Sequence, residues 1–446
     1  MILQKTEAHA LIKKIISYSK ADSIEVGLGG SISNNIRFAV NTVSTSGAYT
    51  DININISSNF GKRSGTVTLT SMEDNDIENA VKASEAIAKL APENPEFMAP
   101  LGPAKGYLDV KQFFPETAEI APEKCAEKVF YVIDEARKRG NITAAGYFEN
   151  SAGFTAIGNS NGMFAYETAT AANFSTTVRT DDGTGSARVE REFADIKRLD
   201  IKSYSNIAIQ KSTSSREPKE MKPGKYPAIL EAPAAADMVG LLMGFMRRRS
   251  ADEGRSYFSE PGGKTKLGME LVDKRVNIYS DPTDPVAPAS SFNREGFPLK
   301  RTEWFTNGVL KNLSTSRYWA QKNNLEFVPG PSNTIMQGGT KTLEQLIKET
   351  ESGILVSRLW YIRTVDPQQM LLTGLTRDGI FYIENGKIQY PIKNFRFNES
   401  PVNVLKNVVD MSVSEKVVGA ETGDDKLVVP ALKLSSFNFS TLSDAI

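Results

Sequence analysis

The stretch Ile380-Phe-Tyr-Ile-Glu-Asn-Gly-Lys-Ile-Gln-Tyr390 decides the fold of the second half of this chain. Two β-prone runs flank an Asn-Gly pair, and both residues of that pair tolerate the positive φ angles of a tight hairpin turn. A second run, Trp304-Phe-Thr-Asn-Gly-Val-Leu310, has the same form. Both segments therefore predict antiparallel hairpins, and we expect the second half to be a strand-rich, largely antiparallel β domain.

This domain is expected to begin with a strand at Ala228 to Glu231 and a helix from about Ala234 to Arg249. The helix is apolar nearly all round, which indicates burial on most sides. Arg247, Arg248 and Arg249 follow its apolar run, and cations suit the negative end of a helix dipole. The alternative role for these arginines is contact with a substrate or a partner.

The first half mixes helices and strands. Helical spacing of apolar residues predicts a helix from Gln4 to Ser19, and strict alternation predicts a strand over Asp51 to Ile56. Further strands are predicted at Ser23 to Gly27, Asn35 to Ser44 and Ser64 to Thr70. Helices are predicted at Asp74 to Leu90 and Pro122 to Arg139. Short strands are predicted from Ile142 to Val189, with a turn at Asn161-Gly162.

A chain of 446 residues is too long for one ordinary core, so two domains are expected. The segment Ser212 to Pro227 has no periodicity and three prolines, as surface connections do. We place the boundary there and predict an α+β protein. Residues 1–215 would form an N-terminal mixed α/β domain and residues 216–446 the strand-rich C-terminal domain.

Charge and hydropathy exclude several partners. Lys plus Arg and Asp plus Glu number 53 each, so neither a nucleic acid nor an anionic membrane is an expected partner. The longest apolar run, Met238 to Met246, is far shorter than the ~20 residues of a membrane span. The amino end shows no signal-peptide pattern. We expect a cytoplasmic protein.

The chain has one histidine, His9, and one cysteine, Cys125. No intramolecular disulfide or thiolate metal cluster is therefore possible, and nucleophilic triads and typical zinc sites lack their histidines. We interpret His9 as an ordinary helix residue and Cys125 as a buried small apolar residue.

Other motifs favour a structural interpretation. Ser17-Tyr-Ser-Lys20 matches Ser-x-x-Lys, but the companion motifs are missing. Gly27-Leu-Gly-Gly30 is not followed by a helix start and is interpreted as a turn, and Asp181-Asp-Gly-Thr-Gly185 as a hairpin turn. The acidic pairs Asp181-Asp182 and Asp424-Asp425 lie in glycine-rich loops, so nothing indicates a hydrolase that works by paired carboxylates or Ser-Lys chemistry.

Several segments resemble the TldD/PmbA family, whose members are often labelled modulators of DNA gyrase. They are Ile36-Arg-Phe38, Ala228 to Arg249, Ser291-Phe-Asn-Arg-Glu-Gly-Phe-Pro298, Gly353 to Arg363, Thr373 to Gly386 and Pro391-Ile-Lys-Asn-Phe-Arg-Phe-Asn-Glu-Ser400. The resemblance implies a two-domain cytoplasmic protein that dimerises around an internal chamber. In this family, a TldD-type subunit binds the metal with a His-Glu-x-x-x-His helix and a cysteine, and a PmbA-type (TldE) subunit lacks these residues.

The resemblance places Met243 and Gly244 where His-Glu would stand and Arg248 where the second histidine would stand. No histidine follows residue 9 and no cysteine follows residue 125, so a different register would not restore a metal site. We therefore expect no catalytic and no metal-binding residue in this chain. The degenerate helix, with Met243, Gly244, Arg247 and Arg248, is the candidate binding site.

Two functions follow from the resemblance. The first is a non-catalytic subunit of a metalloprotease (metallopeptidase) complex, with no cofactor in this chain, a zinc-loaded TldD-like partner, and unfolded peptides as substrates for proteolysis. The alternative is a homodimer that binds a peptide or protein without hydrolase activity. Any effect on gyrase is expected to be indirect, because no nucleic-acid module is recognisable.

Overall fold

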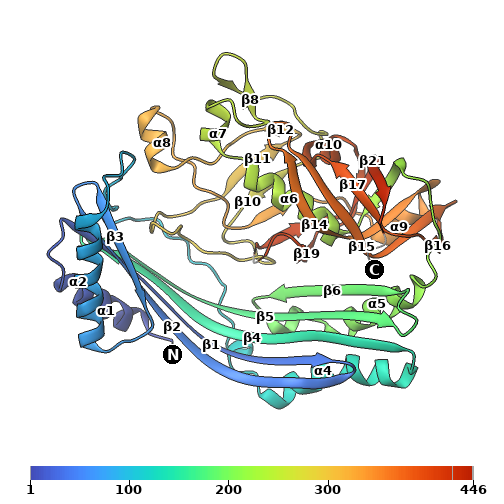
Figure 1. Cartoon of the computed structure of the whole chain (residues 1–446), viewed down its shortest axis with the longest axis horizontal. Coiled ribbons are helices and arrows are strands. Elements are labelled where there is room, and N and C mark those ends of the chain that lie inside the picture. The colour runs from blue at the N-terminus through green and yellow to red at the C-terminus, as the bar shows by residue number, and fades with distance from the viewer. Residues whose placement is uncertain (1, 424, 444–446) are drawn as a thin grey trace.

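A long, curved antiparallel sheet forms the first half of the chain in the computed structural model, which describes residues 2–423 and 425–443 (Figure 1). Its strand order is β3-β2-β1-β4-β5-β6. The strands are β1 Ser23–Ala39, β2 Thr42–Phe60, β3 Arg63–Leu69, β4 Ile142–Asn159, β5 Phe164–Thr180 and β6 Ser186–Phe193. Four of the six have 17 to 19 residues, which makes the sheet long enough to bend under the whole second half.

The helices of the first half cover one face of this sheet (Figure 1). They are α1 Lys5–Ser17, α2 Asp74–Leu90, α3 Pro115–Ala118, α4 Pro122–Arg139 and α5 Ile201–Ser214, with a 3-10 turn at Ile196–Arg198. Val26 and Leu28 pack among α1 and α2, while Phe38 packs against α4. The helix bounds predicted for α2 and α4 are confirmed, and the predicted first helix is confirmed over Lys5–Ser17.

The opposite face of the sheet carries small and polar side chains. Gly29, Ser31, Gly153 and Ala169 line a cavity between this face and the second half. Gly27-Leu-Gly-Gly30 therefore lies inside β1, and its interpretation as a turn is wrong. A Cβ on Gly153 would come within 2.8 Å of the Gly30 carbonyl oxygen, so glycine here reflects crowding between neighbouring strands.

Two further strand predictions for this half need correction. Asn35 to Ser44 is not one strand, because Val40 and Asn41 adopt φ angles of 50° and 56° and turn the chain from β1 into β2. The predicted short strands after Ile142 are long, with 18 residues in β4 and 17 in β5. The turn at Asn161-Gly162 and the hairpin turn at Asp181 to Gly185 are confirmed.

The second half contains a closed ring of five strands. Pairings β14–β7, β7–β21, β21–β17, β17–β15 and β15–β14 complete the ring, and all except β14–β7 are antiparallel. The ring strands are β7 Gly224–Leu230, β14 Ser352–Asp366, β15 Leu371–Glu384, β17 Phe395–Glu399 and β21 Leu432–Leu442. Strands β16 Lys387–Pro391 and β18 Val408–Met411 pair with β15 and β21, respectively, so the predicted hairpin at Asn385-Gly386 is confirmed.

A second sheet, β12-β11-β10-β13-β20-β19, lies beside the ring. Its strands are β10 Ile278–Ser280, β11 Thr302–Thr306, β12 Val309–Leu310, β13 Thr334–Met336, β19 Glu415–Val417 and β20 Leu427–Val429, and β8 Ser259–Glu260 pairs with β9 Lys264–Thr265. The helices are α6 Ala232–Phe245, α7 Arg248–Asp252, α8 Arg317–Lys322, α9 Leu343–Lys348 and α10 Pro401–Lys406. The α+β class, the strand-rich second half and the hairpin at Asn307-Gly308 are confirmed.

The predicted connection Ser212 to Pro227 is shorter than expected. Helix α5 continues to Ser214 and β7 begins at Gly224, because strand pairing with β21 orders Lys225 and Tyr226. The division into residues 1–215 and 216–446 stays a prediction. Across this division, Lys211 pairs with Glu231 and Ser186 donates a hydrogen bond to Asp378.

Candidate functional site

Helix α6 is buried at the centre of the second half. It packs against β14, β19 and β20, and Met238, Val239 and Leu242 are completely buried. Glu231 precedes it in an extended conformation, and a proline stands in its first turn, where the missing N–H leaves no hydrogen bond unmade. The sequence prediction that something covers this helix on most sides is confirmed.

The predicted end of this helix at Arg249 is wrong. The chain leaves the helix after Phe245, and Met246 adopts ψ 58°. The carbonyl oxygen of Met246 accepts hydrogen bonds from both the amide and the hydroxyl of Ser314, each 2.9 Å long. These bonds replace the helical ones, so the arginines do not stand at the negative end of α6.

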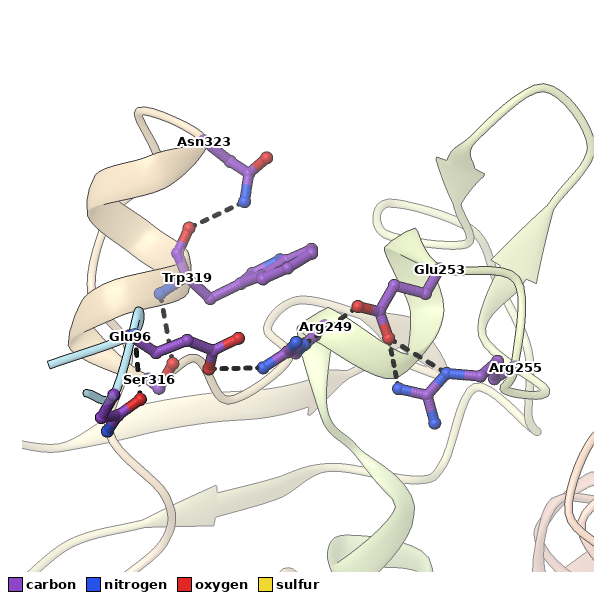
Figure 2. A network of polar contacts seen from close by, with 8 residues as sticks. Glu96, Arg249, Glu253, Arg255, Ser316, Trp319 and Asn323 are labelled. Atoms are coloured by element: carbon purple, nitrogen blue, oxygen red, sulfur yellow. Dashed lines mark hydrogen bonds and ion pairs between the residues drawn. The ribbon is translucent and has the colours of Figure 1, made fainter. Parts of the chain in front are cut away.

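Each of the three arginines has a different environment. Arg248 lies in α7 and donates to Asp252, which also accepts from the indole of Trp319. Arg249 lies between Glu96 and Glu253 with its guanidinium 4.9 Å from the Trp319 ring centre (Figure 2). Arg247 is exposed, and within residues 2–423 and 425–443 its guanidinium has no hydrogen bond or ion pair.

Three of the four predicted site residues line one cavity of about 370 Å³. Met243 and Gly244 from α6 lie beside Arg247, whereas Arg248 is directed to Asp252 and does not line it. The remaining lining residues are Gly240, Ser314, Gly330, Pro331, Ser332, Asn333, Thr334, Asp425 and Lys426.

The wall opposite α6 is held firmly by Asn333. Its amide nitrogen donates to the carbonyl oxygens of Asp281 and Ala287, and its side-chain oxygen accepts from the Asp281 amide at 2.8 Å. On the α6 side, a Cβ added to Gly244 would meet no atom within 4 Å, so open space lies directly above this turn of the helix.

The cavity does not fit zinc. Zinc is bound by histidine, thiolate and carboxylate groups, and Asp425 is the single such residue among the described residues that line it. His9 stacks on Phe164 in the first half, 4.3 Å between ring centres, and Cys125 is buried in α4. In the part of the chain that the structure describes, no three His, Cys, Asp or Glu residues form a group able to hold a metal ion.

Lys426, which sequence reasoning missed, lines this cavity and the cavity of about 360 Å³ above the curved sheet. Its ammonium donates to the Pro288 carbonyl oxygen at 2.7 Å. Burial lowers the pKa of Lys426 and that of Lys416, which lies 3.6 Å from Glu192. No sequence motif marks these lysines, because the pairing of β19 with β20 and the docking of the first half bring them together.

Asp237 was also missed, although a lone acid in an apolar helix was a legible signal. It is fully buried and accepts the Glu421 amide at 2.8 Å, so it fastens the loop after β19 onto α6. Burial raises the pKa of Asp237 to about 7. Its other carboxylate oxygen has no hydrogen-bond partner among the residues that the structure describes.

Comparison with known proteins identifies the family. The model of the PmbA/TldA metallopeptidase C-terminal domain matches residues 223–441, and that of the central domain of the same proteins matches residues 115–216. The chain belongs to the PmbA/TldD family. The resemblance carried by the quoted motifs is thereby confirmed.

Relatives of this PmbA/TldD protein span almost its whole length. The metalloprotease PmbA of Escherichia coli O157:H7 is 23% identical over 440 residues, 92% of this chain and 93% of the relative. The crystal structure of TldE from Thermococcus kodakarensis superposes with a TM-score of 0.85 at 19% identity, covering 96% of this chain and 99% of that one. A structure from Bacteroides thetaiotaomicron, described as a putative modulator of DNA gyrase, gives 0.86 at 18% identity, covering 99% and 100%. These structures share its fold.

No helix in the described part of this PmbA/TldD protein is both long and apolar enough to cross a membrane.

Proposed function

We propose that this protein is a non-catalytic subunit of a cytoplasmic PmbA/TldD-type metallopeptidase complex that degrades or processes unfolded peptides. One observation carries the proposal: the cavity over α6 is walled by Met243, Gly244, Arg247 and Lys426, and Asp425 is the single potential metal ligand among the described residues that line it. Helix α6 is buried, and the space above Gly244 is open. Such a surface can hold part of a peptide and cannot activate water.

A zinc-loaded TldD-like subunit would supply the chemistry. In such a partner, two histidines and a cysteine hold the metal, and the glutamate of His-Glu-x-x-x-His serves as general base. This chain would complete the peptide site from the other side. Its formal net charge of 0 supports a peptide rather than a nucleic acid as the ligand.

The test is cleavage of an unstructured peptide by this protein alone, by its His-Glu-x-x-x-His relative with zinc, and by both together. Activity confined to the mixture is the expected result. A mixture containing the relative with its motif glutamate changed to glutamine is the matched control and should be inactive. Equal activity without this chain, or activity of this chain alone, would contradict the proposal.

The second candidate function is a homodimer that binds peptides without proteolysis. The guanidinium of Arg247, which has no partner among the described residues, favours it, because a charged group that lines a cavity suits an anionic ligand whether or not a catalytic partner is present. Sedimentation of this chain mixed with its relative separates the two candidates. A mixed dimer supports the first function, and a homodimer that excludes the relative supports the second.

A further inference from the structure

The cavity over α6 contains an excess of positive charge. Arg247 and Lys426 both line it, and among the residues that the structure describes Asp425 is the one carboxylate in the lining. Two cations and one anion give a net charge of about +1, which one bound carboxylate would cancel.

The two cations retain unused hydrogen-bond donors. The guanidinium of Arg247 has five N–H donors and, among the residues described, none of them is engaged. The ammonium of Lys426 has three donors, and among the described residues the Pro288 carbonyl oxygen accepts from one of them. Arg248 and Arg249, in contrast, are both paired with carboxylates.

The ammonium of Lys426 loses part of its hydration in the folded protein. Glu167 and Glu192, which line the second cavity, attract its ammonium, but burial outweighs them and lowers its pKa. A half-buried cation such as Lys426 is stabilised when an anion binds beside it.

The cavity also has the shape of a preformed site. Asn333 fixes one wall through three hydrogen bonds, Met243 of the buried helix forms another, and the space above Gly244 is empty. Little order has to be created on binding, which favours affinity.

We propose that the cavity bounded by Met243, Arg247 and Lys426 binds a carboxylate of an unfolded peptide, and that this carboxylate is the one at the peptide's carboxyl terminus. This inference rests on the proposed function, since it names the part of the peptide that this chain holds. Arg247 reaches the carboxylate from the exposed rim, and Lys426 reaches it from a half-buried position in the wall.

Fluorescence anisotropy with the full chain tests the site. Three dye-labelled ten-residue peptides are compared: a free acid, the same sequence as a carboxyl-terminal amide, and the amide with glutamate as its last residue. We expect the free acid to bind at least about tenfold more tightly than the amide, because charge-assisted hydrogen bonds contribute that much. If only the glutamate amide binds tightly, the cavity still binds a carboxylate, and that carboxylate belongs to a side chain and not to the peptide terminus.

Variants connect the preference to the cavity. Arg247→Gln and Lys426→Met should each remove the difference between acid and amide, whereas Arg137→Gln, at an exposed site on α4, should preserve it. Gly244→Leu adds a side chain where no atom lies within 4 Å, so it should fold normally and weaken binding of all three peptides.

Three results would overturn the inference. They are that the wild-type protein binds none of the three peptides, that it binds acid and amide equally, or that the preference persists in both Arg247→Gln and Lys426→Met. The proposed subunit function is judged separately, by cleavage in the mixture with the zinc-loaded relative, so the two can fail independently.

Discussion

The ammonium of Lys211 lies 2.8 and 2.6 Å from the two carboxylate oxygens of Glu231, and this ion pair joins α5 of the first half to the start of α6. Glu231 also accepts a hydrogen bond from Ser357 on β14 at 2.8 Å. Glu231 is 9% exposed, so the pair is shielded from water. It ties the position of the site helix to the docking of the two halves.

Lys211→Met should destabilise the protein by about 3 kcal/mol, because it leaves a buried carboxylate without its counter-charge. Urea unfolding followed by tryptophan fluorescence measures the loss. Lys138→Met is the matched control, since Lys138 pairs with Glu135 at the surface, where water screens the pair, and its loss should change stability much less. Equal losses in the two variants would show that the Lys211 pair does not differ from a surface pair.

Arg249→Met should loosen the segment around Glu96, which reaches the second half through this arginine (Figure 2). The pair is partly exposed, so we expect up to about a fivefold increase in amide exchange for residues 94–97. Hydrogen exchange read by mass spectrometry provides the measurement.

Arg255→Met is the control for this change. Arg255 binds the same Glu253 but does not contact Glu96, so exchange at residues 94–97 should stay at the wild-type rate. If both variants accelerate exchange to the same extent, the contact between Glu96 and Arg249 does not hold the segment.

Cys125 should resist alkylation in the folded protein. Its side chain is 2% exposed, its thiol lies 3.7 Å from the Asn150 side-chain oxygen, and burial raises its pKa to about 11. Thiolate is the reactive form, so iodoacetamide at pH 8 should label the urea-unfolded chain fully while leaving the native chain unlabelled. Rapid labelling of native protein would contradict the buried position.

Local sequence signals predicted much of this fold. Helices α2 and α4 begin and end as predicted, because proline and flanking breakers define their ends within the segments themselves. The Asn-Gly hairpins were equally legible, since the turn residues alone require positive φ angles, and Asn307 and Asn385 adopt them.

Long-range contacts explain what the sequence did not reveal. Helix α6 ends early because Ser314, 68 residues later, binds the Met246 carbonyl oxygen. Lys426 reaches the cavity only after β19 and β20 pair, so the sequence pointed to three of the residues that line this cavity and did not point to Lys426. Gly29 looked like a turn residue, because a glycine that is needed for the close approach of neighbouring strands cannot be told from a turn glycine by the local sequence.

Asp237 should make stability depend on pH. Its pKa is raised by burial to about 7 in the folded protein, against about 4 for an unfolded aspartate. Between these values the folded state binds a proton that the unfolded state has released, so the free energy of unfolding should decrease as pH rises from about 4 to about 7. Above that range the contribution of this group no longer changes.

Asp237→Asn should flatten this slope, because an amide does not titrate and its oxygen can still accept the Glu421 amide. Denaturant unfolding of both proteins at pH 5, 6, 7 and 8 gives the comparison, with Asp134→Asn on the exposed side of α4 as a control for the loss of one carboxylate. A slope that Asp237→Asn leaves unchanged would mean that Asp237 is ionised throughout. In that case the hydrogen bond from the Glu421 amide, which holds the loop after β19, would be accepted by a charged carboxylate at every pH tested.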